Sequence, residues 1–196
     1  MLDFQNPWLE TYPENNNGRS RRSISCFKEA LKLFQQARDR AFFYRLKNAV
    51  LRRLGRLFDL NSLPLGNIRS RHYSGIRAVP IAQIFGTLGR SEDFDNQFHP
   101  LTNRSRDRWV AIAMVRFQNQ PLDAVKLIQV GNRYFVEDGH HRISVARALG
   151  QAEIDAEVTV WEFGGTTLPW DAHKADEKST TASRPQEVYE TALSGG

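Results

Sequence analysis

Five consecutive residues in the second half of the chain combine side chains that are well suited to holding a phosphate. They are Asp138, Gly139, His140, His141 and Arg142. A predicted strand precedes them and a predicted helix follows, and this order presents backbone N–H groups to an anion. Gly139 permits a close approach or a positive φ where a Cβ would interfere. We therefore expect a phosphate-binding turn here.

The side chains of this turn indicate how a phosphate would be held. Arg142 lies in the first turn of the predicted helix, where its planar guanidinium can form two hydrogen bonds to a phosphate. His140 and His141 can donate to phosphate oxygens and can change charge near neutral pH. A cation at a helix start is unfavourable without an anion. We therefore expect Arg142→Ala to abolish nucleotide binding and to leave the fold intact.

Asp138 needs a separate explanation, because a carboxylate beside a phosphate repels it. It can bind a metal ion, take up a proton or cap the helix. A magnesium ion between the carboxylate and nucleotide phosphates is the usual arrangement. The plain structural alternative is that Asp138 only caps the helix and that the histidines and the arginine are surface residues, because short motifs also arise by chance.

A metal site without a nucleotide is a further alternative, with Asp138, His140 or His141 as ligands. A closed zinc site needs about four ligands, usually thiolates or imidazoles. The other three histidines are scattered through predicted loops and the tail. The wide spacing of these histidines makes a zinc site the less favoured alternative.

The segments around the turn alternate between strand and helix patterns. A strand is predicted over Val125–Val130, followed by a tight turn at Gly131-Asn132 and a returning strand over Tyr134–Glu137. The helix after the turn places its apolar residues on one face and ends at Gly150. A closing strand is predicted from Ile154 to Trp161.

Upstream of these segments, the pattern predicts one short strand and one helix. The strand covers Val79–Ile84 and leads to Arg90, and the acidic stretch Ser91–Asp95 that follows is predicted to be a loop. Ser105 is predicted to cap a helix that ends before Pro121.

A long basic segment precedes this domain. From Ser25 to Leu60, aromatic and aliphatic residues recur at helical spacing, with Lys and Arg on the opposite face. Residues 1–77 carry 15 basic and 6 acidic residues, a net charge of +9, whereas residues 78–164 and 165–196 each carry −2. Such an uneven charge distribution can indicate a surface that binds nucleic acid or an acidic membrane, although a helix face exposed to solvent is the commoner cause.

Composition limits the class of protein. The single cysteine, Cys26, excludes an intramolecular disulfide, and the chain has neither a basic and apolar leader nor a run of about 20 apolar residues. We expect a soluble cytoplasmic protein without a membrane span. Its predicted parts are a flexible arm (1–24), a basic helix with a linker that begins at residue 61 (25–78), a domain (79–164) and a disordered tail (165–196).

Residues Val125–Trp161 resemble the conserved half of ParB/sulfiredoxin-like domains, which have a strand, Gly-x-x-Arg, a helix with small residues and a closing strand. Here the motif begins at Gly139 and ends at Arg142, with Ala146 in the helix. A weaker resemblance upstream extends the match to residues 79–162. The resemblance implies an α+β fold: a small mixed sheet with flanking helices, preceded by the long basic amphipathic helix.

The resemblance also implies a ligand. ParB-type proteins bind cytidine triphosphate with this motif, and sulfiredoxin binds adenosine triphosphate with a Gly-Cys-His-Arg version whose cysteine is catalytic. This chain has His140 at the cysteine position, so sulfiredoxin chemistry is not expected. The sequence Asp-Gly-His-His-Arg more closely resembles the motif of the ADP-dependent free serine kinase branch. By that resemblance a nucleoside di- or triphosphate is bound by Gly139, His140, His141, Arg142 and Arg90.

Two functions remain open. The first is a nucleotide-dependent enzyme, either a small-molecule kinase or a nucleotide hydrolase. In it Asp138 binds Mg²⁺ or transfers a proton, His140 takes part in catalysis, and Glu92, from the acidic loop that also holds Asp93 and Asp95, is the candidate base. The second is a non-catalytic nucleotide-gated or DNA-associated module, in which the helix over residues 25–60 contacts nucleic acid. No helix-turn-helix pattern follows the domain, so a role in chromosome segregation is not expected.

Overall fold

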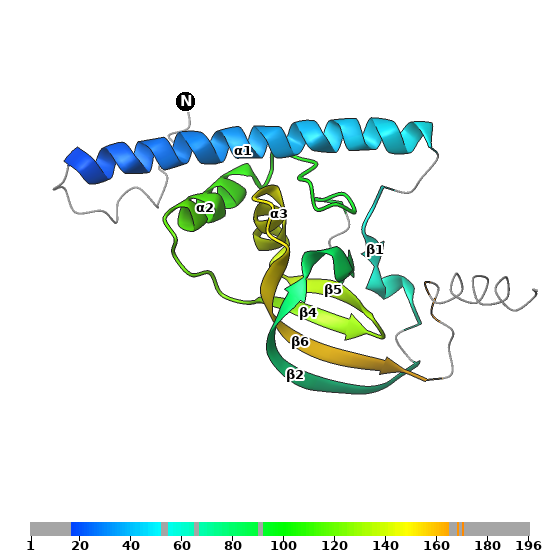
Figure 1. Cartoon of the computed structure of the whole chain (residues 1–196). Coiled ribbons are helices and arrows are strands. Elements are labelled where there is room, and N and C mark those ends of the chain that lie inside the picture. The colour runs from blue at the N-terminus through cyan, green and yellow to red at the C-terminus, as the bar shows by residue number, and fades with distance from the viewer. Residues whose placement is uncertain are drawn as a thin grey trace, which may run out of the picture.

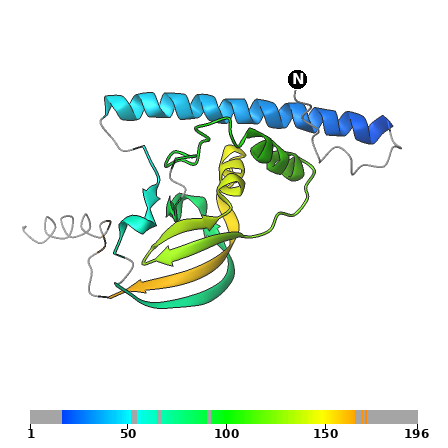
Figure 2. The ribbon, with the colours of Figure 1, turned by 180° about the vertical axis from the view of Figure 1, so that it is seen from behind.

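The computed structural model describes residues 17–51, 55–64, 67–89 and 92–164, together with Leu168 and Trp170, and side chains from residue 23 onward. Within these ranges six strands form one mixed sheet, and three α-helices lie together on one side of it (Figures 1 and 2). This confirms the predicted fold class, a mixed sheet with flanking helices and a long helix in front of them.

The sheet combines parallel and antiparallel pairs. Its strands are β1 (Phe58–Asp59), β2 (Ile68–Pro80), β3 (Ile84–Thr87), β4 (Val125–Val130), β5 (Arg133–Asp138) and β6 (Glu153–Phe163). Their order is β1-β3-β5-β4-β6-β2. The β1–β3, β3–β5 and β4–β6 pairs are parallel, whereas β4–β5 and β2–β6 are antiparallel. The predicted hairpin and closing strand are confirmed, with slightly wider limits.

The sheet starts earlier in the chain than the sequence indicated. Residues 61–78, expected to be a linker, contain most of β2, which pairs with β6 along its length. Only Val79 of this strand is buried, because β2 lies at an edge of the sheet, and exposed edges commonly carry polar residues. The predicted strand Val79–Ile84 is divided between the end of β2, a 3-10 turn over Ile81–Gln83 and the start of β3. The sheet therefore includes residues that lie before the expected domain start at residue 79.

The long helix α1 (Asn17–Val50) also has other limits than predicted. Residues 17–24, assigned to a flexible arm, are helical, and Ser25 lies inside the helix rather than capping it. At the other end, Leu57 and Leu60 are buried residues of the sheet domain and not of the helix. Helical spacing of apolar residues did not distinguish the helix from the segment that follows it.

Two shorter helices, α2 (Arg106–Phe117) and α3 (His140–Ala148), fill the space between α1 and the sheet (Figure 1). Trp109 of α2 is fully buried where the three helices meet. Its ring contacts the edge of Phe34 at 5.4 Å between centroids, and its Nε1 donates to Ser144 Oγ at 2.8 Å. The predicted helix after Ser105 is confirmed, although the Ser105 side chain makes no capping hydrogen bond.

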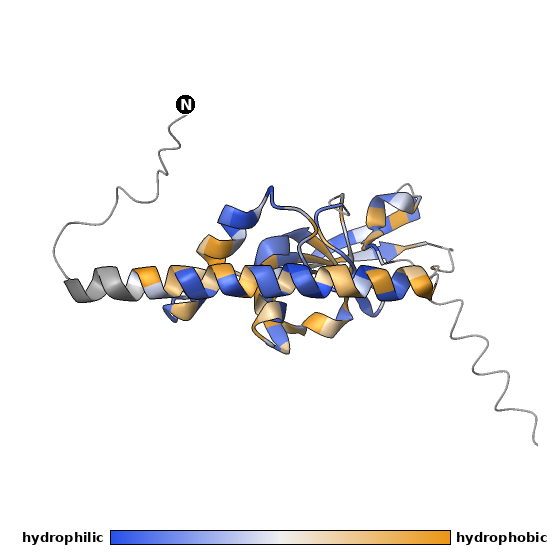
Figure 3. Cartoon of the chain, turned by 90° about the horizontal axis from the view of Figure 1, so that it is seen from above, coloured by the Kyte–Doolittle hydropathy of each residue, from blue (hydrophilic) through white to orange (hydrophobic). Residues whose placement is uncertain are grey.

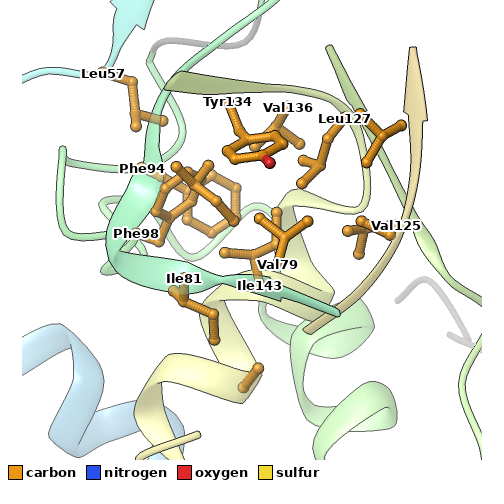
Figure 4. Close-up of a cluster of buried hydrophobic side chains, with 14 residues drawn as sticks. Leu57, Val79, Ile81, Phe94, Phe98, Val125, Leu127, Tyr134, Val136 and Ile143 are labelled. Carbon is orange, nitrogen blue, oxygen red and sulfur yellow. The ribbon is translucent and has the colours of Figure 1, made fainter. Parts of the chain in front are cut away.

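The main core lies between the sheet and α3 (Figure 4). Val125, Leu127 and Val136 come from the sheet, Ile143 from α3, and Phe94 from the loop after β3. All five are almost completely buried. This core holds the end of β5 and the start of α3 in fixed positions, and so it positions the turn that joins them.

Candidate functional site

The turn predicted to bind phosphate lies where β5 passes into α3. The strand ends at Asp138, the helix begins at His140, and Gly139 between them has a φ of 100°. The neighbouring strand β3 runs parallel and ends beside β5, with Thr87 opposite Val136. The N-terminus of α3 therefore lies at the carboxyl edge of a parallel pair, which is where open α/β sheets commonly bind ligands. The predicted order of strand, glycine turn and helix is confirmed.

Gly139 is required by the packing of the protein itself. A Cβ at this position would lie 2.5 Å from Cγ1 of Val125, which is fully buried. The positive φ is also a conformation that side-chain-bearing residues rarely adopt. Glycine at this position therefore has a structural cause, whether or not a ligand approaches the turn.

The two histidines are core residues rather than surface donors. His140 is only 3% exposed and His141 only 8%. His140 Nε2 lies 2.6 Å from Thr87 Oγ1, and the Thr87 hydroxyl in turn donates to the carbonyl of Val136 at 3.3 Å. The imidazole rings were expected to reach phosphate oxygens, but their burial leaves backbone N–H groups as the better candidates for that contact.

Phe94 links the histidines to the acidic loop after β3. Its ring stacks on His140 at 6.1 Å between centroids and meets His141 edge-on at 5.2 Å. Glu92, the expected catalytic base, lies two residues earlier in an exposed turn. Asp95 is buried instead, and it accepts hydrogen bonds from the N–H groups of Gln97 and His99 and contacts the His99 ring. Both carboxylate oxygens of Asp95 are therefore occupied by partners within its own loop.

Arg142 is held by groups of the protein. Its Nη1 donates to the carbonyls of Asp123 at 2.7 Å and Ala124 at 2.9 Å, and its Nη2 donates to Asp138 Oδ2 at 2.7 Å. The anion that a cation at a helix start requires is thus supplied by Asp138. Asp138 does not cap the helix, because the cap residue is Gly139. A bound phosphate is therefore not required to explain an arginine at this position.

These contacts predict that Arg142→Ala destabilises the protein, contrary to the expectation of an intact fold. The change removes the donor of two backbone carbonyls and the partner of a carboxylate, so we expect the free energy of unfolding to fall by about 1.5–3 kcal/mol. Urea denaturation followed by circular dichroism measures it. Arg106→Ala is the control, because Arg106 pairs with Asp107 in an exposed position, where such pairs contribute about 0–1 kcal/mol. Equal midpoints for the two variants would contradict this role of Arg142.

Thr87 and Phe94 are the site residues that sequence reasoning missed. Thr87 reaches the turn because β3 and β5 are parallel neighbours, and Phe94 because the loop after β3 folds back over the core. Neither relation leaves a local pattern in the sequence. Arg90, predicted to bind phosphate, lies outside the described residues.

A cavity of about 490 Å³ lies elsewhere and contains none of the five turn residues. Its polar lining includes Arg56, Asp59, Gln97 and Arg147. Burial lowers the pKa of the Arg147 guanidinium, and the nearby Asp95 carboxylate opposes this effect. The guanidinium donates to the side-chain oxygen of Gln97. Arg147 is in the last turn of α3, whereas the predicted site is at its first.

The described residues contain no group of three or more His, Cys, Asp or Glu side chains arranged to hold a metal ion. A zinc site built from protein ligands is therefore not found in this part of the chain. Asp138 could still contribute a single carboxylate to Mg²⁺ whose other ligands are phosphate oxygens and water, which is the usual mode for that ion.

Comparisons with known proteins give one solved structure with limited similarity. It is sulfiredoxin from Arabidopsis thaliana, with 21% sequence identity and a TM-score of 0.31, over 43% of this chain and 84% of that chain. No family model matches the chain, and no curated protein matches it. Similarity at this level says nothing about the ligand or the reaction.

None of the described helices is both long enough and apolar enough to cross a membrane.

Proposed function

We propose that this chain binds the phosphates of a nucleoside di- or triphosphate at the N-terminus of α3. The observation that carries the proposal is the composition of this helix start. Its cap residue, Gly139, has no side chain with which to bond first-turn N–H groups, no residue of that turn is acidic, and the adjacent carboxylate of Asp138 is paired with Arg142. A helix start of this kind, at the edge of a parallel strand pair, favours an external anion.

Asp138 and Arg142 give the site a means of responding to a metal ion. In the free protein they pair with each other at 2.7 Å, and the Asp138 side chain is half exposed. Asp138 would be the protein ligand of Mg²⁺ bound together with a nucleotide, because that ion prefers carboxylate and phosphate oxygens. In that state Nη2 of Arg142 would be available to donate to a phosphate oxygen, while Nη1 keeps its hydrogen bonds to the two carbonyls.

The first candidate function is a nucleotide-dependent phosphotransferase or nucleotide hydrolase, with Glu92 as the exposed acidic group nearest in sequence to Phe94. In this enzyme His140 is a positioning residue, because its ring is buried against Thr87 and Phe94. The second candidate is a non-catalytic nucleotide-gated module. The side chains of His140 and Asp95 contact other groups of the protein, and this favours the second candidate, because both side chains would otherwise be candidates for proton transfer.

Thermal shift and calorimetry with ADP, ATP and CTP, each with and without Mg²⁺, test the proposal. We expect wild-type protein to bind at least one nucleotide more tightly with Mg²⁺. Asp138→Asn should abolish that Mg²⁺ dependence and strengthen Mg²⁺-free binding by about tenfold, because the change removes the carboxylate that repels phosphate and occupies Arg142.

Asp123→Asn is the matched control. Asp123 is an exposed carboxylate that contacts Arg142 only through its backbone carbonyl, so its change should leave both measurements as in wild type. No melting-temperature shift with any nucleotide at millimolar concentration would refute the proposal.

A further inference from the structure

The face of α1 that points away from the protein changes character along the helix. The opposite face is buried against the rest of the molecule through Ala30, Phe34, Ala37, Ala41 and Asn48. Before residue 40 the exposed positions are mostly polar, and they include Lys28, Lys32, Gln35 and Asp39. Ile24 and Phe27 are the exposed large apolar residues in this part, so they are fewer and farther apart than near the C-terminal end of the helix.

From residue 42 to the end of the helix, the outward positions are apolar. Four residues form an outer apolar stripe: Phe42, Phe43, Leu46 and Val50. Their exposed fractions are 66%, 66%, 56% and 76%, respectively. Positions 42, 46 and 50 are spaced by about one helical turn, and position 43 lies beside them, so the four side chains share one face. A contiguous exposed group of large apolar side chains commonly marks an interaction surface.

Basic residues flank this stripe on both sides. Arg45 lies on one side of it and Arg40 and Lys47 on the other, and all three are exposed. The sequence has no carboxylate from residue 40 to residue 51. An apolar stripe between two rows of cations is the composition of helices that lie in the surface of an anionic membrane, where the apolar residues enter the acyl boundary and the cations remain among the head groups.

The position of α1 leaves this face open to a flat partner. The other described helices and the sheet all lie on one side of α1 (Figures 1 and 2). Seen from above, α1 crosses in front of the molecule, and apolar and polar residues alternate along it up to its C-terminal end (Figure 3). A planar surface can therefore contact the stripe without meeting another described element.

We propose that the second half of α1 docks on an anionic lipid surface through the outer apolar stripe, as a peripheral contact that does not span the bilayer. Two other occupants fit less well. A nucleic acid would not bury Phe and Leu side chains on its phosphate backbone. A second copy, paired through the stripe, would bring the cations at positions 40, 45 and 47 close to those of its partner, with Asp39 as the single carboxylate within residues 36–51.

Vesicle flotation of the full chain tests the proposal. The probes are vesicles of phosphatidylcholine alone and of phosphatidylcholine with about one third phosphatidylglycerol. We expect binding to the anionic vesicles and at least about tenfold weaker binding to the neutral ones. The double variant Phe43→Gln/Leu46→Gln should lose at least about tenfold in partitioning, because two exposed apolar side chains no longer enter the bilayer.

The matched control is Tyr73→Gln/Ile76→Gln on β2, which removes two apolar side chains that are 63% and 65% exposed on another face. This control should bind like wild type. Arg45→Glu/Lys47→Glu is a second variant of the same surface, in case the first one unfolds, and it should also release the protein from anionic vesicles. Equal vesicle binding of all variants, or no vesicle binding of the wild-type protein, would overturn the proposal. It would also be overturned if light scattering showed a wild-type dimer that the stripe variant dissociates, with no protein bound to the vesicles.

Discussion

Gly139→Ala is expected to lower the free energy of unfolding by about 2–5 kcal/mol, which is enough to unfold a marginally stable domain. The φ of 100° at this position disfavours any Cβ by about 1–2 kcal/mol. The new methyl group would also lie 2.5 Å from Cγ1 of the fully buried Val125, and inserting a group into a packed core costs about 1–3 kcal/mol. Thermal and urea denaturation by circular dichroism measure the loss.

Gly150→Ala separates the two causes. Gly150 also has a positive φ, 75°, but nothing lies within 4 Å of the Cβ that alanine would add. Its substitution should therefore cost only the conformational part, about 1–2 kcal/mol. Equal losses at positions 139 and 150 would contradict the packing of the turn against Val125.

Trp109→Ala is expected to lower the free energy of unfolding by about 3–5 kcal/mol, the usual range for deletion of a buried tryptophan ring. Trp109 is fully buried and contacts Phe34 of α1 and Ser144 of α3. Its loss should therefore loosen the attachment of α1, so hydrogen exchange should rise most around Phe34 in the middle of that helix. Urea denaturation measures the loss in free energy of unfolding, and hydrogen exchange on the same sample measures the loosening of α1.

A double-mutant cycle isolates the hydrogen bond of the indole. Trp109→Phe keeps an aromatic ring but leaves the buried Ser144 hydroxyl without its donor, at a cost of about 1–3 kcal/mol. Ser144→Ala in the same protein should recover part of that loss, because both partners are then absent. Strict additivity of the two changes would show that the bond contributes nothing.

The elements near the turn were predictable because each has its own local signal. Gly131 marks the hairpin, Gly150 ends α3, and the apolar residues of β4 and β5 are buried as their strands require. The upstream part lacked such signals. β2 is an edge strand with mostly exposed residues, and its Arg- and Ser-rich sequence has the composition of a linker.

The strand, glycine turn and helix start of the motif were predictable from the sequence, but the contacts of their side chains were not. The motif located the start of α3, yet it did not show that Asp138 and Arg142 pair across one helical turn. It also did not show that His140 and His141 would be covered by Phe94. Both outcomes depend on tertiary contacts with the loop after β3 and with the segment before β4, and the sequence of the motif contains neither.

Backbone amide spectra of ¹⁵N-labelled protein during nucleotide titration test the central claim most directly. If phosphates bind the first turn of α3, the amide signals of His140, His141 and Arg142 should shift progressively with ADP, ATP or CTP in the presence of Mg²⁺. Those of Arg147 and Ala148, at the other end of the same helix, should shift much less. Saturable shifts elsewhere, with these first-turn amides unchanged, would contradict the proposed site, and a spectrum unchanged at millimolar nucleotide would contradict nucleotide binding itself.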